Sequence, residues 1–364
     1  MRGYELLDKM ELIDSEYVDE ADKHPKKKKV IWLKWGVLAA CLGIVSVGVW
    51  GFSQKNQHGN SSFESLQPIK ISELNSGQGF EGYLCYNISE LENGNPWSDN
   101  MEIKTLPVYK NDAYDSSGAG IPKGYEEGTM QKLLDETADL LGLEILATES
   151  SRDGLFVTEL KAETDQGDLV IHANGVITYF PTDVEWEISE LVERYREFLD
   201  FQNPEVVKLR EYTIYGEQNL DCKIYDAVGA EVEEILNYNF NYAQFAPTQD
   251  GKLFLIRKQD KRSLADELGD YPIISVKEAT KLLVNGTYQT SVPYVFPGKE
   301  HIGKVELIYR TGSSEEYLLP YYRFYAELTN VELANGLKTY GAYYVPAVEE
   351  AYIKNMPTYG GIFN

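Results

Sequence analysis

The chain contains few of the residues on which metal sites and disulfide scaffolds depend. It contains four histidines and three cysteines in 364 residues. None of the histidines stands in a His-x-x-x-His pair or beside a cysteine, which excludes the common zinc and metallopeptidase motifs. Cys85 and Cys222 are too few for a disulfide scaffold, and they are open to two interpretations, a single bridge or two separate thiols.

Catalytic motifs are also missing. The sequence has no Gly-x-Ser-x-Gly elbow, no Ser-x-x-Lys and no EF-hand calcium loop. Gly118 and Gly120 lie in a Ser/Gly/Pro loop rather than between a strand and a helix, so we expect no phosphate site there. We therefore predict no catalytic residue, no cofactor and no metal ligand. Glycoside hydrolysis needs only two carboxylates about 5–9.5 Å apart, so an envelope enzyme acting on wall sugars or peptides remains the alternative.

Long apolar runs are limited to one. Residues 35–52, WGVLAACLGIVSVGVWGF, carry no charge, and PKKKK stands before them at residues 25–29. A helix of this length spans about 27 Å, close to the thickness of a bilayer core. We predict one membrane-spanning helix over residues 30–52. Cys41 ends a Leu-Ala-Ala-Cys sequence like a lipoprotein signal box, but the apolar residues after it favour a small apolar residue within the span over a lipidated one.

The charge distribution predicts which side of the membrane each part occupies. Residues 1–34 contain eight acidic and eight basic side chains, so the formal charge of −24 belongs to the rest of the chain. Lysines before a span hold that end in the cytoplasm, and they attract anionic lipids. We predict a single-pass protein of the cell membrane with a cytoplasmic amino terminus and an extracytoplasmic carboxyl-terminal domain. The acidic domain repels nucleic acid and favours cationic partners.

The amino-terminal segment has a helical apolar stripe. Leu6, Met10, Ile13 and Tyr17 recur at spacings of four, three and four, which places them on one helix face. A helix this short is marginal alone, so it needs a surface to pack on. We interpret these four residues as a docking site for a cytoplasmic regulatory protein; a partly folded juxtamembrane segment and a self-association seam are the alternatives.

The rest of the chain predicts an α+β fold. Apolar periodicity favours helices at 126–141, 188–201, 230–238 and 275–284, each followed by strands, and Asn174-Gly175 marks a hairpin turn. The expected architecture is a single transmembrane helix followed by an extracytoplasmic domain of repeated helix-plus-antiparallel-strand units. The expected parts are a cytoplasmic helix and basic run at 1–29, the span at 30–52, a tether at 53–78, a first unit at 79–202, and second and third units at 203–364.

Tyrosine is unusually frequent, with 27 residues, and it is densest in LLPYYRFY at 318–325. In a strand, Tyr321, Arg323 and Tyr325 share one face. We predict that this face binds a peptide or sugar ligand through an arginine held between two tyrosine rings. The alternative is a tyrosine ladder that supports its own sheet, with Arg323 paired to a carboxylate such as Glu327.

Several segments carry a resemblance. MRGYELLDKMELIDSEYVDEA, WLKWGVLAAC, YNISELENGNPW, LGDYPIISVKEATKLLVNGTY and KVELIYRTGSSEEYLLPYYRFYAEL resemble an uncharacterised family of single-pass membrane proteins from clostridia and their relatives. The layout is similar to that of membrane-bound anti-sigma factors, although this tail is shorter than their sigma-binding domain. The order of outer helices and strands is similar to that of PepSY-type ectodomains of envelope regulators, which implies no particular activity.

These patterns favour a cell-envelope membrane protein with an acidic, tyrosine-rich binding or regulatory domain. The envelope enzyme is the second hypothesis, and a plain structural or adhesive domain is the third. We expect a concave, aromatic-lined pocket if the first hypothesis holds.

Overall fold

Strands make up most of the structure. In the computed structural model, 44% of the described residues lie in strands and 21% in helices. The structure describes residues 66–72, 84–85, 88–114, 124–154, 156–213, 215–259, 266–290, 292–312, 314–332 and 336–360. Leu6, Met10, Ile13 and Tyr17, with the segments 1–29 and 30–52, lie outside these ranges.

The expected fold class is wrong. Helix-plus-strand units would each carry their own small sheet, whereas one eight-stranded sheet takes strands from both sides of residue 202. No helix in the described ranges is long and apolar enough to cross a membrane. The expected single transmembrane helix is therefore not part of the observed fold. The order of helices and strands recurs along the chain, but strand pairing does not follow that order.

The eight-stranded sheet is antiparallel throughout. In spatial order its strands are β3 (Ile145–Asp153), β4 (Phe156–Thr164), β5 (Gly167–His172), β6 (Val176–Pro181), β10 (Leu253–Gln259), β9 (Tyr242–Pro247), β8 (Gln218–Asp226) and β7 (Pro204–Tyr212). Tyr179 of β6 pairs with Ile256 of β10, which joins the two halves of the sheet. This long-range pair is what merges the expected units into one sheet.

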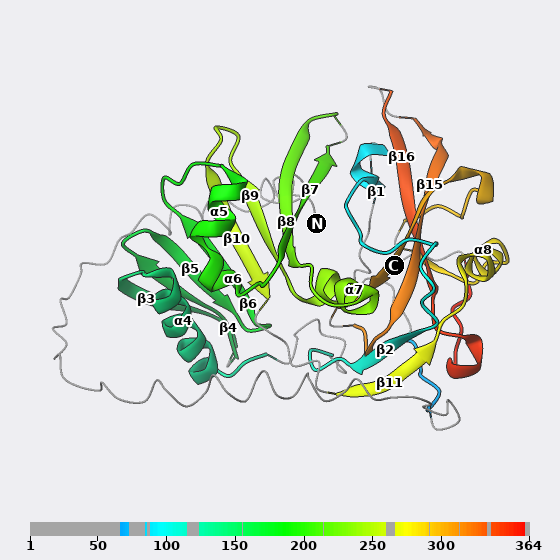
Figure 1. Cartoon of the computed structure of the whole chain (residues 1–364), viewed down its shortest axis with the longest axis horizontal. Coiled ribbons are helices and arrows are strands. Elements are labelled where there is room, and N and C mark those ends of the chain that lie inside the picture. Colours follow the sequence, from blue (N-terminus) through cyan, green and yellow to red (C-terminus); the bar gives the residue numbers. More distant parts are fainter. Residues whose placement is uncertain are drawn as a thin grey trace. The chain divides into compact units, whose positions relative to one another are not determined.

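Three helices cover one face of this sheet (Figure 1). They are α4 (Glu127–Leu141), α5 (Ile188–Arg194) and α6 (Arg196–Leu199). The core between helices and sheet includes Met130, Leu134 and Ala138 of α4, and it also holds Cys222, a buried free thiol. The α4 helix ends at Gly142, whose positive φ of 65° suits glycine and lets its N–H reach the carbonyls of the last turn.

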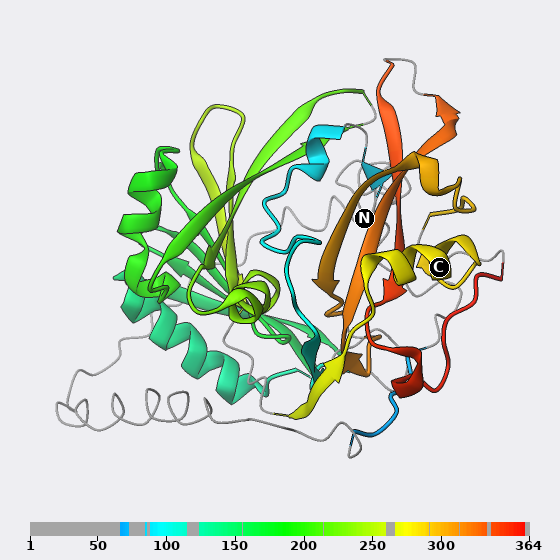
Figure 2. The same ribbon diagram turned by 45° about the vertical axis from the view of Figure 1, so that its right-hand side comes forward.

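The second half of the described chain builds two more sheets. A five-stranded sheet has the order β1 (Leu84–Cys85), β16 (Lys338–Pro346), β15 (Pro320–Glu332) and β13 (Ile302–Tyr309), and β12 (Gln289–Thr290) pairs with β16. A three-stranded sheet has the order β11 (Glu267–Pro272), β2 (Thr105–Lys110) and β14 (Tyr317–Leu318). The helices of this part are α7 (Glu231–Phe240) and α8 (Val276–Val284). Figure 2 shows the yellow α8 beside the orange strands of the five-stranded sheet.

Strand β15 is buried on both faces. Tyr322 and Phe324 pack in the core that includes α8, while Tyr321 and Tyr325 pack in a second core on the opposite face. A strand covered on both sides reads as a continuous apolar and aromatic run rather than as an alternation. This burial explains why LLPYYRFY contains so few polar residues.

Predictions from local sequence signals are confirmed more often than the predicted arrangement of distant segments. Helix α4 and the turn at Asn174-Gly175 lie where expected, and α8 has its capping box, with Ser275 and Glu278 exchanging hydrogen bonds. Strand β7 begins at Pro204. Proline is accepted there because it is the first residue of an edge strand.

Helix α4 offers a matched test of its packed face. Leu134 is fully buried, whereas Leu140 on the same helix is 53% exposed. We expect Leu134→Ala to lower the free energy of unfolding by about 2–5 kcal/mol because it leaves a cavity in the core. Leu140→Ala should change it by less than about 0.5 kcal/mol. Urea denaturation followed by circular dichroism measures both, and equal losses would contradict the helix orientation.

Candidate functional site: a groove around Trp97

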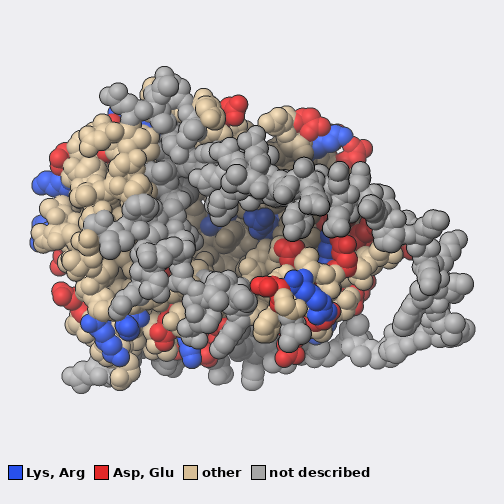
Figure 3. All heavy atoms as spheres, turned by 180° about the vertical axis from the view of Figure 1, so that it is seen from behind, with Lys and Arg blue, Asp and Glu red and all other residues tan. Residues whose placement is uncertain are grey.

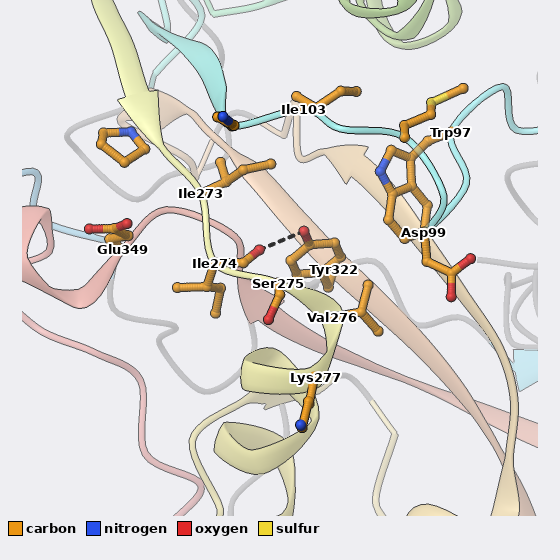
Figure 4. A pocket seen from close by; sticks show the side chains of 13 residues that line it. Trp97, Asp99, Ile103, Ile273, Ile274, Ser275, Val276, Lys277, Tyr322 and Glu349 are labelled. Carbon is orange, nitrogen blue, oxygen red and sulfur yellow. Dashed lines mark hydrogen bonds between the residues drawn. The ribbon is translucent and has the colours of Figure 1, made fainter.

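A cleft of about 620 Å³ opens where three segments of the second half meet. Its walls are the segment 97–104 that leads into β2, the segment 272–277 between β11 and α8, and Tyr322 of β15 (Figure 4). Apolar side chains predominate in the lining: Trp97, Met101, Ile103, Ile273, Ile274 and Val276. Such a lining, partly open to solvent, is typical of a binding site rather than of a closed core.

Main-chain hydrogen bonds hold the two walls of the cleft. The Ile273 N–H donates to the Lys104 carbonyl at 3.0 Å, and the Ile274 N–H donates to the Ala347 carbonyl at 2.8 Å. The Tyr322 hydroxyl donates to the Ile274 carbonyl at 2.7 Å. Burial, with a smaller effect of Glu278, raises the pKa of Tyr322 to about 12, so the hydroxyl stays a donor at physiological pH. The cleft is thus preformed.

Trp97 stands in the middle of the groove. Its ring lies 5.5 Å from the ring of Tyr322, tilted by 58°, and it remains partly exposed. The side chain of Asn95 fixes the segment before it: the Trp97 N–H donates to Asn95 Oδ1, and Asn95 Nδ2 donates to the Leu307 carbonyl of β13. Asn95 thus links the main chain of Trp97 to β13.

A second cavity of about 380 Å³ continues the cleft on the other side of Trp97. Trp97, Asp99 and Val276 line both cavities, and the second adds residues 302–305 at the start of β13. The two cavities therefore form one groove, which we call the Trp97 groove.

The edge of β13 is open where it borders this groove. In one strand the outward-facing N–H and C=O groups alternate with those that pair inward. On the outer edge, the Leu307 carbonyl accepts from Asn95 and the Tyr309 N–H donates to Asn239. By the same alternation, Val305 directs its N–H and C=O outward, and neither group has a hydrogen-bond partner among the residues that the structure describes. Val305 thus presents an unpaired donor and acceptor to the groove.

The charged side chains of the groove are of mixed sign and stand apart. Asp99 and Glu349 lie on opposite sides of the pocket, with Ile273 and Ile274 between them (Figure 4). A hydrolase of the expected alternative type needs two neighbouring carboxylates. The arrangement of Asp99 and Glu349 does not favour that chemistry. Across the described ranges, no group of three or more His, Cys, Asp and Glu side chains is placed to hold a metal ion.

The residues predicted from the sequence to bind a ligand lie outside this groove. Tyr321 and Tyr325 are buried, at 0% and 1% exposure, and Arg323 pairs with Glu306 at 2.6 Å while its guanidinium lies 5.1 Å from the Tyr325 ring. Glu327, the partner named in the alternative, instead pairs with Lys338 at 2.9 Å. Tyr321, Arg323 and Tyr325 do share one face of β15, but Tyr321 and Tyr325 belong to the core. A ligand role for the three residues stays a prediction.

Glu306 is the hub of a buried charge cluster. Its carboxylate pairs with Lys304 at 2.7 Å and with Arg323 at 2.6 Å, and it accepts a hydrogen bond from Asn93. Burial raises the pKa of this carboxyl, but Arg323 and Lys304 outweigh burial and hold it below its ordinary value. Lys304 also donates to the Leu91 carbonyl. The cluster thereby ties β13 to β15 and to the segment before Trp97.

Trp97 and Val305 were not predicted from the sequence as site residues. Trp97 follows Asn-Gly-Asn-Pro, a loop sequence, and a tryptophan in a loop is a signal for a partly exposed aromatic contact. Nothing in the local sequence around Val305 shows that β13 is an edge strand. That property depends on which strands pair, and pairing between distant segments leaves no short-range pattern.

Glu306 can be tested by isosteric substitution. We expect Glu306→Gln to lower the free energy of unfolding by about 3–5 kcal/mol at pH 7, because it leaves two partly buried cations, Lys304 and Arg323, without their anion. The depressed pKa means that this contribution is present above pH 4.5 and is lost as pH falls through the folded-state pKa. Glu327→Gln, in a more exposed pair, should cost less than about 1 kcal/mol. Urea unfolding at pH 7 and pH 3 measures the loss of unfolding free energy in each variant. Equal losses in Glu306→Gln and Glu327→Gln would contradict the role of the cluster.

Comparisons with known proteins add no relative from which a role could be transferred. No family model matches the sequence, and no curated protein matches it. The resemblance to clostridial single-pass membrane proteins therefore stays a prediction. The chemistry of the Trp97 groove is the basis for assigning a function.

Proposed function

We propose that this protein is a non-enzymatic binding protein whose Trp97 groove takes an extended polypeptide segment of a partner. The observation that carries the proposal is the unpaired N–H and C=O of Val305 at the edge of an apolar, aromatic groove. An extended peptide that adds to a sheet edge gains main-chain hydrogen bonds there, and pockets beside the edge accept alternate side chains.

The groove fits such a ligand in shape and in chemistry. The two cavities lie on either side of Trp97, so successive inward-facing side chains of one extended peptide have a place on each side. Trp97 and Tyr322 supply rigid aromatic area, which is common at the energetic centre of peptide interfaces. Asp99 at one side and Lys277 at the edge of α8 offer charges of both signs to the polar side chains of the peptide.

Long-range electrostatics add a preference for the partner. The chain carries a formal net charge of −24, so an acidic peptide meets repulsion and a basic or neutral one does not. Screening limits this effect to about 8–10 Å at physiological salt, so it acts on the rate of encounter more than on the bound state. We therefore expect apolar residues at alternate positions and basic residues between them.

A sugar is the second candidate ligand, because a partly exposed indole beside Asp99 also suits a polyhydroxylated ring. A sugar has no main chain that could pair with Val305. The Val305 edge therefore distinguishes the two candidates. A cell-membrane location and a cytoplasmic regulatory partner for residues 1–29 are separate predictions on which this proposal does not depend.

Proline at position 305 tests the main-chain contact. Proline removes the outward N–H but no bond of the β13–β15 ladder, and edge strands accept it at such positions. Nine-residue peptides selected on the immobilised full chain from a random phage library would serve as probes. We expect Val305→Pro to weaken the selected peptides by about tenfold, the effect of one lost hydrogen bond, and Trp97→Ala by about thirtyfold or more.

Val305→Thr is the matched control, because it keeps the N–H and the β-branched shape. It should bind the selected peptides within about twofold of the wild type. Circular dichroism of each variant verifies that the sheets are intact. Failure to enrich any peptide, or enriched peptides that bind Val305→Pro and Trp97→Ala like the wild type, would contradict the proposal.

A further inference from the structure

Lys223 lies on the face of the eight-stranded sheet opposite the helices. Its neighbours in β8, Cys222 and Ile224, point into the core beneath α4, α5 and α6, so the alternation of a strand places Lys223 on the other face. It pairs across the sheet with Gln244 of β9, which in turn pairs with Arg257 of β10. The three side chains therefore form one row on this face.

The ammonium group of Lys223 is held by aromatic rings rather than by an acid. Its Nζ lies 3.6 Å from the centre of the Tyr238 ring and 4.0 Å from that of Tyr242. It makes no ion pair and no hydrogen bond with any residue in the described part of the chain. Cation–π contacts stabilise a cation less than a buried acid would.

The carboxylate that acts on Lys223 electrostatically is already engaged. Glu306 raises the pKa of Lys223, but its two oxygens bind Lys304, Asn93 and Arg323. Glu306 thus has two direct cation partners before Lys223 is counted. Burial and the nearby Arg323 lower the pKa of Lys223 to about 7, while Glu306 opposes them only in part. The positive charge on Lys223 is costly unless an anion joins the cluster.

This cationic group sits within a protein that is strongly acidic elsewhere. Figure 3 shows Lys and Arg atoms inside a hollow on the side of the molecule away from the viewer of Figure 1. An enclosed positive site raises the local concentration of small anions even when the net charge is negative. Lys223 lines neither cavity of the Trp97 groove, so an anion site at Lys223 is separate from the proposed peptide function.

We propose that Lys223, with Arg323 behind it and the rings of Tyr238 and Tyr242 beside it, binds the oxyanion group of a small ligand, a carboxylate or a phosphate. The anion neutralises positive charge that Glu306 alone does not balance. Lys223 contacts the anion directly. Because Arg323 is already paired, it acts on the anion through its field. The rings of Tyr238 and Tyr242 line the site and position the ammonium group of Lys223.

Protonation of Lys223 couples this site to pH. The charged and titratable groups around it are Tyr238 of α7, Tyr242 of β9, Arg257 of β10, Arg323 of β15, Glu306 and Lys304 of β13, and Asp221 and Tyr225 on its own strand. Burial raises the pKa of Tyr238, and Arg323 keeps its charge, so neither titrates near neutrality. Burial raises the pKa of Asp221 from its ordinary acidic value, and its carboxylate accepts a hydrogen bond from Gln244. Anion affinity should therefore follow the charge of Lys223.

Calorimetric titration of the full chain with sulfate and with succinate, in chloride buffers of constant ionic strength, tests the site. Sulfate represents a tetrahedral oxyanion and succinate a carboxylate. We expect at least one to bind at pH 6.5, with proton uptake and with an affinity that falls by up to about tenfold per unit above pH 7.5. Whichever anion binds better identifies the class of ligand.

Two variants separate the site from general charge effects. Lys223→Met should weaken the bound anion more than tenfold, and Lys223→Arg should keep the affinity but remove its fall with rising pH. Lys161→Met is the matched control, because Lys161 lies on the same face of the sheet and is paired with Asp168 at 2.9 Å. It should change the affinity by less than about twofold.

The same variants reveal whether the fold has survived. Lys223→Met should unfold at or above the wild-type temperature, because methionine removes a half-buried charge that lacks an acid partner. Absence of binding by both anions, wild-type affinity in Lys223→Met, or an affinity that does not vary between pH 6 and pH 9 would each overturn the proposal.

Discussion

The buried carboxylate of Glu306 is the interaction on which both sites depend. It holds Lys304 of its own strand, Arg323 of the neighbouring strand and Asn93 of the segment that leads to Trp97. Without it, β13 would lose its polar link to that segment, and two cations would stay buried without an anion. Its position fixes the edge of β13 on the groove side and leaves Lys223 without an acid of its own.

The two proposed binding surfaces differ in chemistry. The Trp97 groove is apolar, preformed and bordered by an unpaired main-chain edge, which suits an extended peptide. The surroundings of Lys223 are cationic and walled by tyrosines, which suits a small anion. Because Glu306 contacts Lys304 and Arg323 together, an anion beside Lys223 would act on the same strand that borders the groove. The proximity gives the two sites a physical route for coupling.

Local sequence signals predicted local structure. The apolar periodicity of residues 126–141 and 275–284 predicted α4 and α8. The fold class could not be predicted in the same way, because the β6–β10 pair joins residues far apart in sequence. The Tyr321–Tyr325 run was interpreted as half exposed, although both faces of β15 are covered. The site was missed because the open edge at Val305 depends on that long-range pairing.

Amide hydrogen exchange at Val305 reports directly on whether this edge of β13 is open. We expect the Val305 amide of the free chain to exchange much faster than that of Glu306, whose amide pairs inward with β15. Binding of a peptide selected on the groove should then slow exchange at Val305 while leaving Glu306 unchanged. A Val305 amide as protected as Glu306 in the free chain, or one that a bound peptide does not protect, would contradict this expectation.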